Sequence, residues 1–398
     1  MMYAQTMMGV IQSKKINIRY TYEIYKSTKE IPQSWEKLSG NNIFLSLPYL
    51  VVLESTAPEN MICHFIGVFH HKELVAIAIS QYLNLNQTNT YGHRGKQDES
   101  SIRNFLFKHC TSQVLVVGNS MLTGQHAFGM KEGADKTAIF NSLKSAAEQL
   151  RKGFKKEGIK IHLTIFKDFG THECGDFKTA NFKSSYQFSV QPNMVFPLRK
   201  EWKSMQDYVA SLSKKYRSQF KRCCSKSSII EKRELELDEI VKNEERIHEL
   251  YLNVSHNAPF NTFYLTKNHF SEFKKKLSEN FIFIGYFIDE KLVGFITLIN
   301  NNGTLDTYFL GYDNSIQKEK MLYLNMLYNM IEHAIGNGYE EIVFGRTALE
   351  IKSSVGAQPQ KMIGFMQHSN FFLNKLLPFF FAYFEPEVSW KERSPFVS

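Results

Sequence analysis

The sequence predicts an α/β fold with mixed sheets, built as two tandem domains. The stretch Phe65–Val75 (FIGVFHHKELV) returns as Phe283–Val293 (FIGYFIDEKLV) with the same spacing. In both copies a polar turn separates two apolar runs, which is the pattern of a β-hairpin. Later in each half a helix leads through a glycine into a strand, at Gly158–Phe166 and at Gly338–Gly345. The recurrence predicts one domain duplicated within the chain, and the alternative is a chance similarity of two short strands.

Length and composition agree with two soluble domains. The chain has 398 residues, of which 43% are hydrophobic and 22% are charged, so each half can bury a core of its own. We expect a first domain over residues 1–190 and a second over residues 191–398, with the boundary near Gln191 and Pro192. If the protein has an active site, we expect it in the second domain.

Charge and cysteine content restrict the partners and the compartment. The formal net charge of +9 favours anionic partners, which include nucleic acid, phosphate-bearing cofactors, acidic carrier proteins and anionic lipid. The five cysteines show no CxxC pair and no zinc spacing, so we expect reduced thiols, no metal site and a cytoplasmic protein. The sequence has no run of about 18 apolar residues, as a membrane-spanning helix requires. Peripheral contact with the inner face of the membrane remains an alternative.

The elements of the first half follow from their periodicity. Pro48 suits the first turn of a helix, and the polar segment Asn84–Glu99 is typical of an exposed loop. Apolar residues recur on one face of the segment Ala134–Lys156, which predicts a helix. The expected elements in order are a helix around Trp35–Leu38, a helix from Pro48, a hairpin over Ile62–Leu83, a strand over Val114–Val117, the helix Ala134–Lys156 and a strand over Ile159–Phe166.

In the second half, three helices precede the repeated hairpin. Asp238 and Thr266 are suitable N-cap residues for the second and third helix. The expected elements in order are a helix over Glu201–Ser225, the helices that start near Asp238 and Thr266, a hairpin over Phe281–Ile299, a strand over Thr304–Tyr312, a helix over Glu319–Ile335 and a strand over Glu341–Gly345.

The order of hairpin, central strand, helix and strand resembles the GNAT acyltransferase fold, and a tandem pair resembles the FemAB-like branch of that superfamily. Three segments strengthen the resemblance: Leu212–Lys221 (LSKKYRSQFK), Phe344–Pro359 (FGRTALEIKSSVGAQP) and Trp390–Phe396 (WKERSPF). The resemblance implies transfer of an acyl group to an amine. The donor would be an acyl-thioester co-substrate such as acyl-CoA or acyl carrier protein, with no permanently bound cofactor.

The resemblance implies that the strand Thr304–Tyr312 lines the reaction cleft. By alternation, Asp306, Tyr308, Leu310 and Tyr312 share one face of this strand, and Thr307 and Phe309 share the other. We interpret Asp306 and Tyr308 as a candidate base and acid, although a core tyrosine and a strand-end aspartate would show the same pattern.

Three further residues belong to the expected site. Gly311 and Tyr312 follow on the same strand and are expected to contact substrate. His256, in a loop where GNAT-like proteins contact their acceptors, is a further candidate base.

Basic residues form the expected anion site. Lys214, Arg217 and Lys221 lie on one helical face, and the resemblance implies that Arg217 lies in the cleft between the domains. Arg346 and the pair Glu350 and Lys352 follow the last shared strand, where the resemblance implies contacts with a donor or acceptor. The alternative is that these charges simply face water.

One departure from the family pattern leaves the donor open. The loop Tyr312–Lys320 (YDNSIQKEK) lacks the glycines with which most GNAT enzymes bind pyrophosphate. Acyl-CoA, acyl carrier protein and aminoacyl-tRNA therefore remain candidate donors, with tRNA less favoured, and the acceptor is a small-molecule or lipid amine. Two alternative functions remain, an aminoacyl-tRNA-dependent FemAB-type transferase for a cell-wall precursor and a non-catalytic, degenerate GNAT binding module. The sequence lacks the long coiled-coil arm of some tRNA-dependent members.

The segment Phe371–Phe384 (FFLNKLLPFFFAYF) is unusually apolar. We expect it to pack in the core of the second domain. The alternative is peripheral contact with a membrane or a lipid substrate, because apolar residues and net positive charge together favour anionic lipid surfaces.

Overall fold

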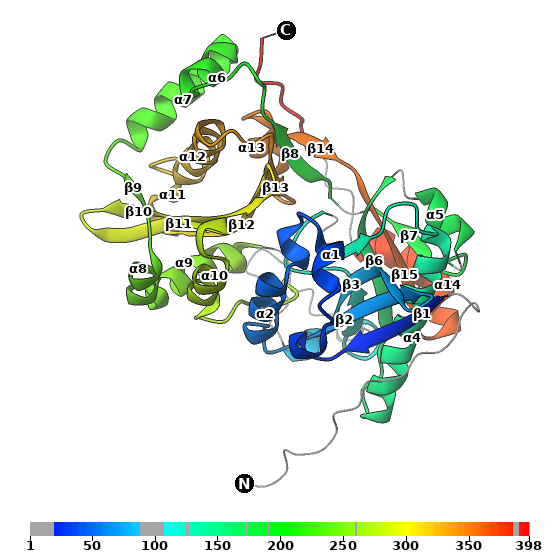
Figure 1. Cartoon of the computed structure of the whole chain (residues 1–398). Coiled ribbons are helices and arrows are strands. Elements are labelled where there is room, and N and C mark those ends of the chain that lie inside the picture. The colour runs from blue at the N-terminus through cyan, green and yellow to red at the C-terminus, as the bar shows by residue number, and fades with distance from the viewer. Residues whose placement is uncertain are drawn as a thin grey trace.

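The protein folds around two mixed β-sheets that are flanked by helices, as Figure 1 shows for a computed structural model. The structure describes residues 20–87, 107–124, 127–171, 174–180, 182–189, 191–258, 261–384 and 390–397. Most of the loop expected at Asn84–Glu99 lies outside these residues.

The first sheet follows the order β1-β2-β3-β4-β6-β15-β7, with β5 beside β3. Its strands are β1 (Tyr20–Tyr25), β2 (Met61–His70), β3 (Glu73–Asn84), β4 (Gln113–Val117), β5 (Phe128–Met130), β6 (Leu163–Gly170), β7 (Tyr186–Phe188) and β15 (Met362–His368). The associated helices are α1 (Trp35–Ser39), α2 (Leu47–Ser55), α4 (Lys136–Lys156), α5 (Cys174–Thr179) and α14 (Phe371–Phe384).

The second sheet follows the order β9-β10-β11-β12-β13-β8-β14. Its strands are β8 (Asn193–Pro197), β9 (Glu231–Glu234), β10 (Phe281–Ile288), β11 (Lys291–Asn301), β12 (Thr304–Tyr312), β13 (Glu341–Gly345) and β14 (Gln358–Gln360). The helices around it are α6 (Met205–Ser211), α7 (Lys214–Lys226), α8 (Leu237–Lys242), α9 (Glu244–Asn257), α10 (His269–Leu277), α11 (Asn314–Gln317), α12 (Leu322–Gly336) and α13 (Leu349–Ser353).

The two sheets repeat one arrangement. In each, four strands are joined by antiparallel pairings, the fourth strand then pairs with the fifth in parallel, and the remaining pairings are antiparallel. The fourth strand is β4 in the first sheet and β12 in the second, as the sequence predicts. The duplicated fold is therefore confirmed, and chance similarity of the hairpins is excluded.

The repeated hairpins match in detail. Both turns hold two consecutive residues at positive φ, His71 and Lys72 in one and Asp289 and Glu290 in the other. A methyl group added at Gly67 would lie 2.9 Å from Leu74 Cδ1, and one added at the equivalent Gly285 would lie 3.2 Å from Leu292 Cδ1. Each glycine therefore lets a leucine of the partner strand pack closely over the backbone.

One strand of the second half, β15, pairs in the sheet of the first half, and β8 marks where the chain passes from the first sheet to the second. β8 directly follows the edge strand β7 of the first sheet but pairs in the second sheet, between β13 and β14. β15 directly follows β14 of the second sheet but pairs in the first, between β6 and β7. A division at residue 190 therefore does not follow sheet membership, because the segment that holds β15 and α14 returns to the first sheet.

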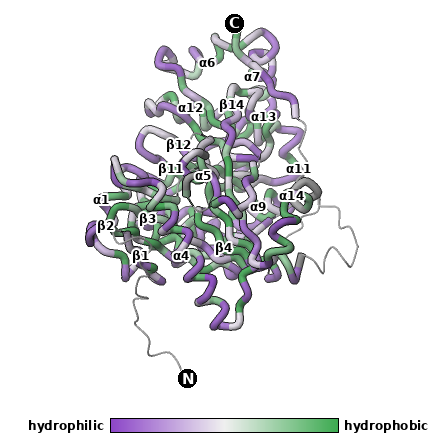
Figure 2. Tube along the Cα trace, turned by 90° about the vertical axis from the view of Figure 1, so that its right-hand side faces the viewer, coloured by the Kyte–Doolittle hydropathy of each residue, from purple (hydrophilic) through white to green (hydrophobic). Residues whose placement is uncertain are grey.

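Three hydrophobic clusters support these sheets. One lies between the first sheet and α4, and another lies between the second sheet and α12 with α6 and α7. The third joins the inner faces of both sheets through α1, α2, α8, α9 and α10. Figure 2 shows the strands as mostly hydrophobic and the outer turns and helices as more hydrophilic. The two halves therefore share a continuous core.

The helix expected over Glu201–Ser225 is two helices. Leu212 adopts an extended backbone between α6 and α7 and forms a bridge with Phe396, and the next amide, at Ser213, donates to Pro395 O over 2.8 Å. The C-terminal segment thus interrupts the helix by pairing with its backbone. Strand β9 then occupies part of the segment between the expected helices.

Candidate functional site

The second sheet splits between β12 and β13. Their parallel pairing covers Thr304 to Asp306 on β12 and ends there, although β12 continues to Tyr312. At the split, Thr307 Oγ1 donates to Val343 O over 3.0 Å. The residues from Thr307 to Leu310 are all partly exposed, whereas the neighbouring strand β11 is almost fully buried. The part of β12 beyond this last pairing therefore remains partly exposed, and we call this stretch, residues 307–310 beside the end of β13, the β12 slot.

A β-bulge shapes the β12 slot. The pairing of β11 with β12 shifts between Ile296 and Leu298, so that Thr297 alone faces Tyr308 and Phe309. The Thr297 hydroxyl donates to Phe309 O over 2.7 Å and accepts from Phe309 N over 3.0 Å. A side-chain hydroxyl therefore holds the bulge in place.

The bulge also changes which residues share a face. Tyr308 and Phe309 both pack toward the core between the sheets, whereas Leu310 and Tyr312 pack toward the core under α12. The expected alternation, with Tyr308, Leu310 and Tyr312 on one face, is wrong because the bulge inserts a residue between them.

Tyr308 lies where the two halves meet. Its hydroxyl lies 3.0 Å from His269 Nε2 and donates to Met121 Sδ over 3.6 Å. Burial and the neighbouring tyrosines Tyr49 and Tyr251 raise the pKa of Tyr308 well above its ordinary value. Burial lowers the pKa of His269 to about 3. Tyr308 therefore keeps its proton at neutral pH and can donate a hydrogen bond from its hydroxyl, while His269 is neutral beside it.

Asp306 lies at the base of the split and is only 2% exposed. Asn301 Nδ2 donates to its carboxylate over 3.3 Å, and Asn301 Oδ1 accepts from the Ile43 amide of the first half over 3.0 Å. Asp306 thus belongs to a polar network that links the two halves.

In the first sheet, a loop fills the position that corresponds to the bulge of β12. By the hairpin and strand registers, Val117 corresponds to Thr307, and Gly118 and Ala127 correspond to the bulge residues Tyr308 and Phe309. Ile79 corresponds to Thr297: its carbonyl accepts from Gly118 N over 3.0 Å and its amide donates to Ala127 O over 2.8 Å. A loop is therefore inserted in the first sheet at the position of the bulge.

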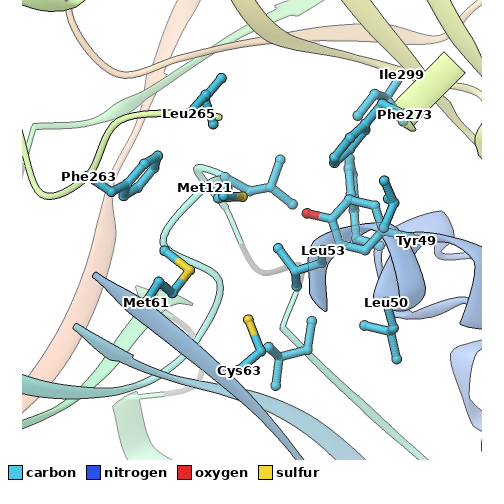
Figure 3. Packing of buried hydrophobic residues seen from close by; sticks show 14 of the residues in the cluster. Tyr49, Leu50, Leu53, Met61, Cys63, Met121, Phe263, Leu265, Phe273 and Ile299 are labelled. Carbon is cyan, nitrogen blue, oxygen red and sulfur yellow. The ribbon is translucent and has the colours of Figure 1, made fainter. Parts of the chain in front are cut away.

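The inserted loop is fixed by buried polar contacts. Asn119, which is 3% exposed, donates to Tyr49 Oη over 2.8 Å, and Ser120 N donates to Gln81 Oε1 over 2.6 Å. Lys167 Nζ donates to the carbonyls of Asn119 and Leu122 over 2.8 and 3.1 Å. Figure 3 shows Met121 of this loop among buried residues from both halves. The loop thus closes its own sheet and forms a wall beside Tyr308.

A buried ion cluster joins the two sheets just beyond their splits. The Asp168 carboxylate, 3% exposed, pairs with Lys167 and with Arg346. Strand registers make Asp168 and Arg346 equivalent positions of the two halves. Arg346, expected to bind substrate, is thus held by a carboxylate of the first half. Burial, and then Arg346, lowers the pKa of Lys167 well below its ordinary value.

Lys352 is 4% exposed rather than free in a cleft. Its ammonium group donates to the carbonyls of Phe344, Gly345 and Arg346 over 2.7, 3.2 and 2.8 Å. Three donors thereby satisfy the carbonyls at the end of β13, and burial lowers the pKa of Lys352 to about 7. The structure therefore departs from the expectation that Lys352 is available to an anion, and its effect on binding stays a prediction.

The basic residues of α7 lie elsewhere. Lys214, Arg217 and Lys221 are exposed, and Arg217 Nη1 donates to Ala210 O over 3.4 Å. Their helix packs on α12 and α13 through Gln219, which reaches Tyr328 and Ser354. Arg217 and Lys352 thus contact different parts of the chain, and their expected shared cleft is not formed by these contacts.

The other residues predicted for the site contact neighbouring parts of the chain. Glu350 pairs with Arg393 of the C-terminal segment, and His256 lies with its ring edge-on to Tyr264, with centroids 5.7 Å apart. A methyl group at Gly311 would lie 2.6 Å from the Tyr251 amide nitrogen, so Gly311 allows α9 to approach β12. Tyr312 O accepts from Asn253 Nδ2 over 3.4 Å. These contacts leave any ligand-binding role as a prediction.

After β12 the chain forms the short helix α11 before α12 begins. Within the described part of the chain, α12 begins after Met321, whose φ is +51°, without a side-chain hydrogen bond at the cap. Its first amides are therefore donors without a capping side chain, in the segment that follows β12 and α11. Among the described residues, no group of three or more His, Cys, Asp or Glu is arranged to hold a metal ion.

Three features of this site were missed in the sequence. His269 looked like an ordinary residue at a helix start, and Lys167 and Asp168 looked like a loop after a strand. The contacts of Gly118 and Asn119 were missed as well, because they depend on partners that no local pattern reveals.

The sequence matches no family model and no curated protein. Among solved structures, a tandem GNAT protein from the clavulanic acid biosynthesis pathway, solved without AcCoA, has a TM-score of 0.51 at 8% identity, covering 88% of this chain and 99% of its own. A C-terminal domain assigned to a lysylphosphatidylglycerol synthetase of Agrobacterium fabrum has a TM-score of 0.50 at 9% identity, covering 92% and 100%. FemX has a TM-score of 0.49 at 11% identity, covering 82% and 96%. The resemblance seen in the sequence is thus confirmed as a tandem GNAT-like fold.

Proposed function

We propose that this chain, which has a tandem GNAT-like fold, is an N-acyltransferase that moves an acyl group from an acyl-thioester to an amine in the β12 slot. The observation that carries the proposal is the accessible, bulged strand β12 at the split of the second sheet. A thioester arm needs an extended backbone with which to pair, and β12 continues past its last pairing with β13.

Two groups at the slot suit the chemistry. At the bulge the Phe309 amide donates to the Thr297 hydroxyl over 3.0 Å, and in the proposed step this amide turns to the oxyanion that forms when the amine attacks the carbonyl carbon. This attack forms the C–N bond, the C–S bond then breaks as the oxyanion collapses, and Tyr308 donates its proton to the leaving sulfur. The proton lost from the amine restores Tyr308, with Asp306 as the nearby candidate base.

The donor's anionic part has a candidate place at the start of α12. Helix amides at an N-terminus attract phosphate without help from glycines. One structural neighbour is the tandem GNAT protein that was solved without AcCoA, and its description names AcCoA as the ligand left out. This supports acyl-CoA as the first donor to test.

The test is transfer itself. The purified protein is incubated with acyl-CoA thioesters of increasing chain length and a mixture of amines that includes amino acids and aminolipids, and free thiol and new amides are measured. We expect thiol release that depends on an amine and that Tyr308→Phe abolishes. Amine-independent release that is unchanged in the variant would contradict the proposal.

Aminoacyl-tRNA-dependent transfer is the second candidate, favoured by the exposed basic residues Lys214, Arg217 and Lys221. A neighbour assigned to a lysylphosphatidylglycerol synthetase lends it support as well. Aminoacyl-tRNA replaces acyl-CoA in the same assay. Transfer from aminoacyl-tRNA alone, weakened by changing these three residues to alanine, would favour this donor.

A further inference from the structure

Helix α14 presents apolar side chains to the outside. Phe371, Phe372, Leu376 and Phe379 are 65, 75, 43 and 74% exposed. The last three lie at i, i+4 and i+7, so they form one stripe along the helix. The expectation that this segment packs in the core of the second domain is wrong for these residues, because the helix follows β15 onto the first sheet (Figure 1).

The opposite side of α14 attaches it to the first sheet. Leu377 is 4% exposed, and Asn374 donates to Ser184 O and accepts from His368 N, both over 2.8 Å. Asn370 Oδ1 accepts from the amides of Phe372 and Leu373 over 2.9 and 3.2 Å and so begins the helix. These contacts fix which side faces outward, so the exposed stripe is a defined surface. We call Phe371, Phe372, Leu376 and Phe379 the α14 patch.

Lysines lie on α14 and near the residues that attach it to the first sheet. The helix sequence contains Lys375 and no acidic residue, and Lys375 Nζ lies 4.5 Å from the centroid of the Phe371 ring. Lys183 is exposed next to Ser184, which binds Asn374. Lys160 is exposed and acts electrostatically on His368, at the end of β15. The acidic residues that follow in the sequence, Glu385 and Glu387, lie outside the described residues.

We propose that the α14 patch docks on an anionic membrane surface, with its aromatic rings in the headgroup region and its lysines on the phosphates. Exposed phenylalanines beside lysines fit this environment, because apolar burial and attraction to anionic lipid act together. The same lysines would repel those of a second copy, which disfavours self-association through this patch. Among the described residues, no helix has the length and apolar character needed to cross a bilayer, so the contact is peripheral.

The test is co-sedimentation of the full chain with vesicles, without any substrate, so that it stands apart from the proposed transferase activity. The probes are vesicles of phosphatidylcholine alone and of phosphatidylcholine with phosphatidylglycerol in equal parts. We expect binding to the anionic vesicles that weakens with added salt. The double variant Phe372→Ser, Phe379→Ser should bind at least about tenfold more weakly, because two rings no longer enter the membrane.

A matched control is the double variant Ile229→Ser, Val241→Ser, which removes two apolar side chains that are 56 and 54% exposed elsewhere. It should bind like the unchanged protein. Equal binding of both double variants, or no binding to anionic vesicles at low salt, would overturn the proposal. Self-association in sedimentation velocity that Phe372→Ser, Phe379→Ser removes, with no vesicle binding, would assign the patch to a second copy instead.

Discussion

The two sheets share strand order, direction and hairpin geometry, yet they differ at one equivalent position. In the second sheet, Tyr308 and Phe309 are consecutive, and Thr297 holds them in a bulge on a partly exposed strand. In the first sheet their equivalents Gly118 and Ala127 are separated by a loop, and Ile79 binds both of its ends. The same split is therefore accessible in one half and closed in the other.

This difference shows how a duplicated fold divides its roles. The loop that closes the first split also brings Met121 to the Tyr308 hydroxyl. One half thus loses its own slot and supplies a wall of the other. A split sheet alone is not enough for a site, because the residues at the bulge decide whether the strand stays accessible.

The largest expected effect separates the two halves in catalysis. Tyr308→Phe should lower kcat/KM by about 10²–10⁴-fold if the hydroxyl is the proton donor. Tyr82→Phe removes a hydrogen-bonded hydroxyl from β3 of the first sheet and should leave the rate nearly unchanged. The measurement is amine-dependent thiol release with both variants. Similar losses in both would remove the functional distinction between the halves.

The next effect concerns the ion cluster between equivalent positions. Asp168→Asn should destabilise the fold by about 3–5 kcal/mol, because it leaves Lys167 and Arg346 without their carboxylate in a buried place. The measurement is urea unfolding. Glu73→Gln breaks the exposed pair with Lys131 and should lower the free energy of unfolding far less, because solvent screens the pair. Equal costs would mean that the cluster is solvated rather than buried.

Acid should weaken the second half through His269. The pKa of His269 is lowered from 6.5 to about 3 by burial, so the unfolded chain takes up a proton below pH 6.5 while the folded chain does not. Stability should therefore fall as the pH drops from 6.5 toward 3, by on the order of a few kcal/mol. His269→Gln should remove part of this loss in urea unfolding. His64, whose pKa burial lowers to about 4, gives the matching test in the first half.

The smallest expected effect tests whether the two repeated hairpins are equivalent. Gly67→Ala and Gly285→Ala should each cost about 1–3 kcal/mol, because the new methyl group meets the equivalent leucines Leu74 and Leu292. Thermal unfolding measures both. Gly153→Ala, in open space on α4, serves as the control and should not destabilise. A large cost in one hairpin alone would show that the repeated turns are not energetically equivalent.

The sequence was sufficient for the architecture because the repeated hairpin is a local pattern. Phe65–Val75 and Phe283–Val293 carry their turns and glycines within a few residues, so spacing alone identified the duplication. Asp306 and Tyr308 were placed on the central strand by the same reasoning. Three other features depend on contacts between segments that are distant in the sequence. They are the pairing of β15 in the first sheet, the bulge in β12 and the contacts of Lys352. Alternation cannot reveal a bulge, since the inserted residue changes the face of every later side chain.

We expect the donor to bind along β12 and not along β4. Hydrogen–deuterium exchange of the full chain, with and without a hydrolysis-resistant analogue of a donor that the transfer assay identifies, tests it most directly. We expect the analogue to protect the amides of residues 307–312 and to leave those of residues 114–117 unchanged. Protection of residues 114–117, or of neither strand under saturation with a donor that is turned over, would contradict it.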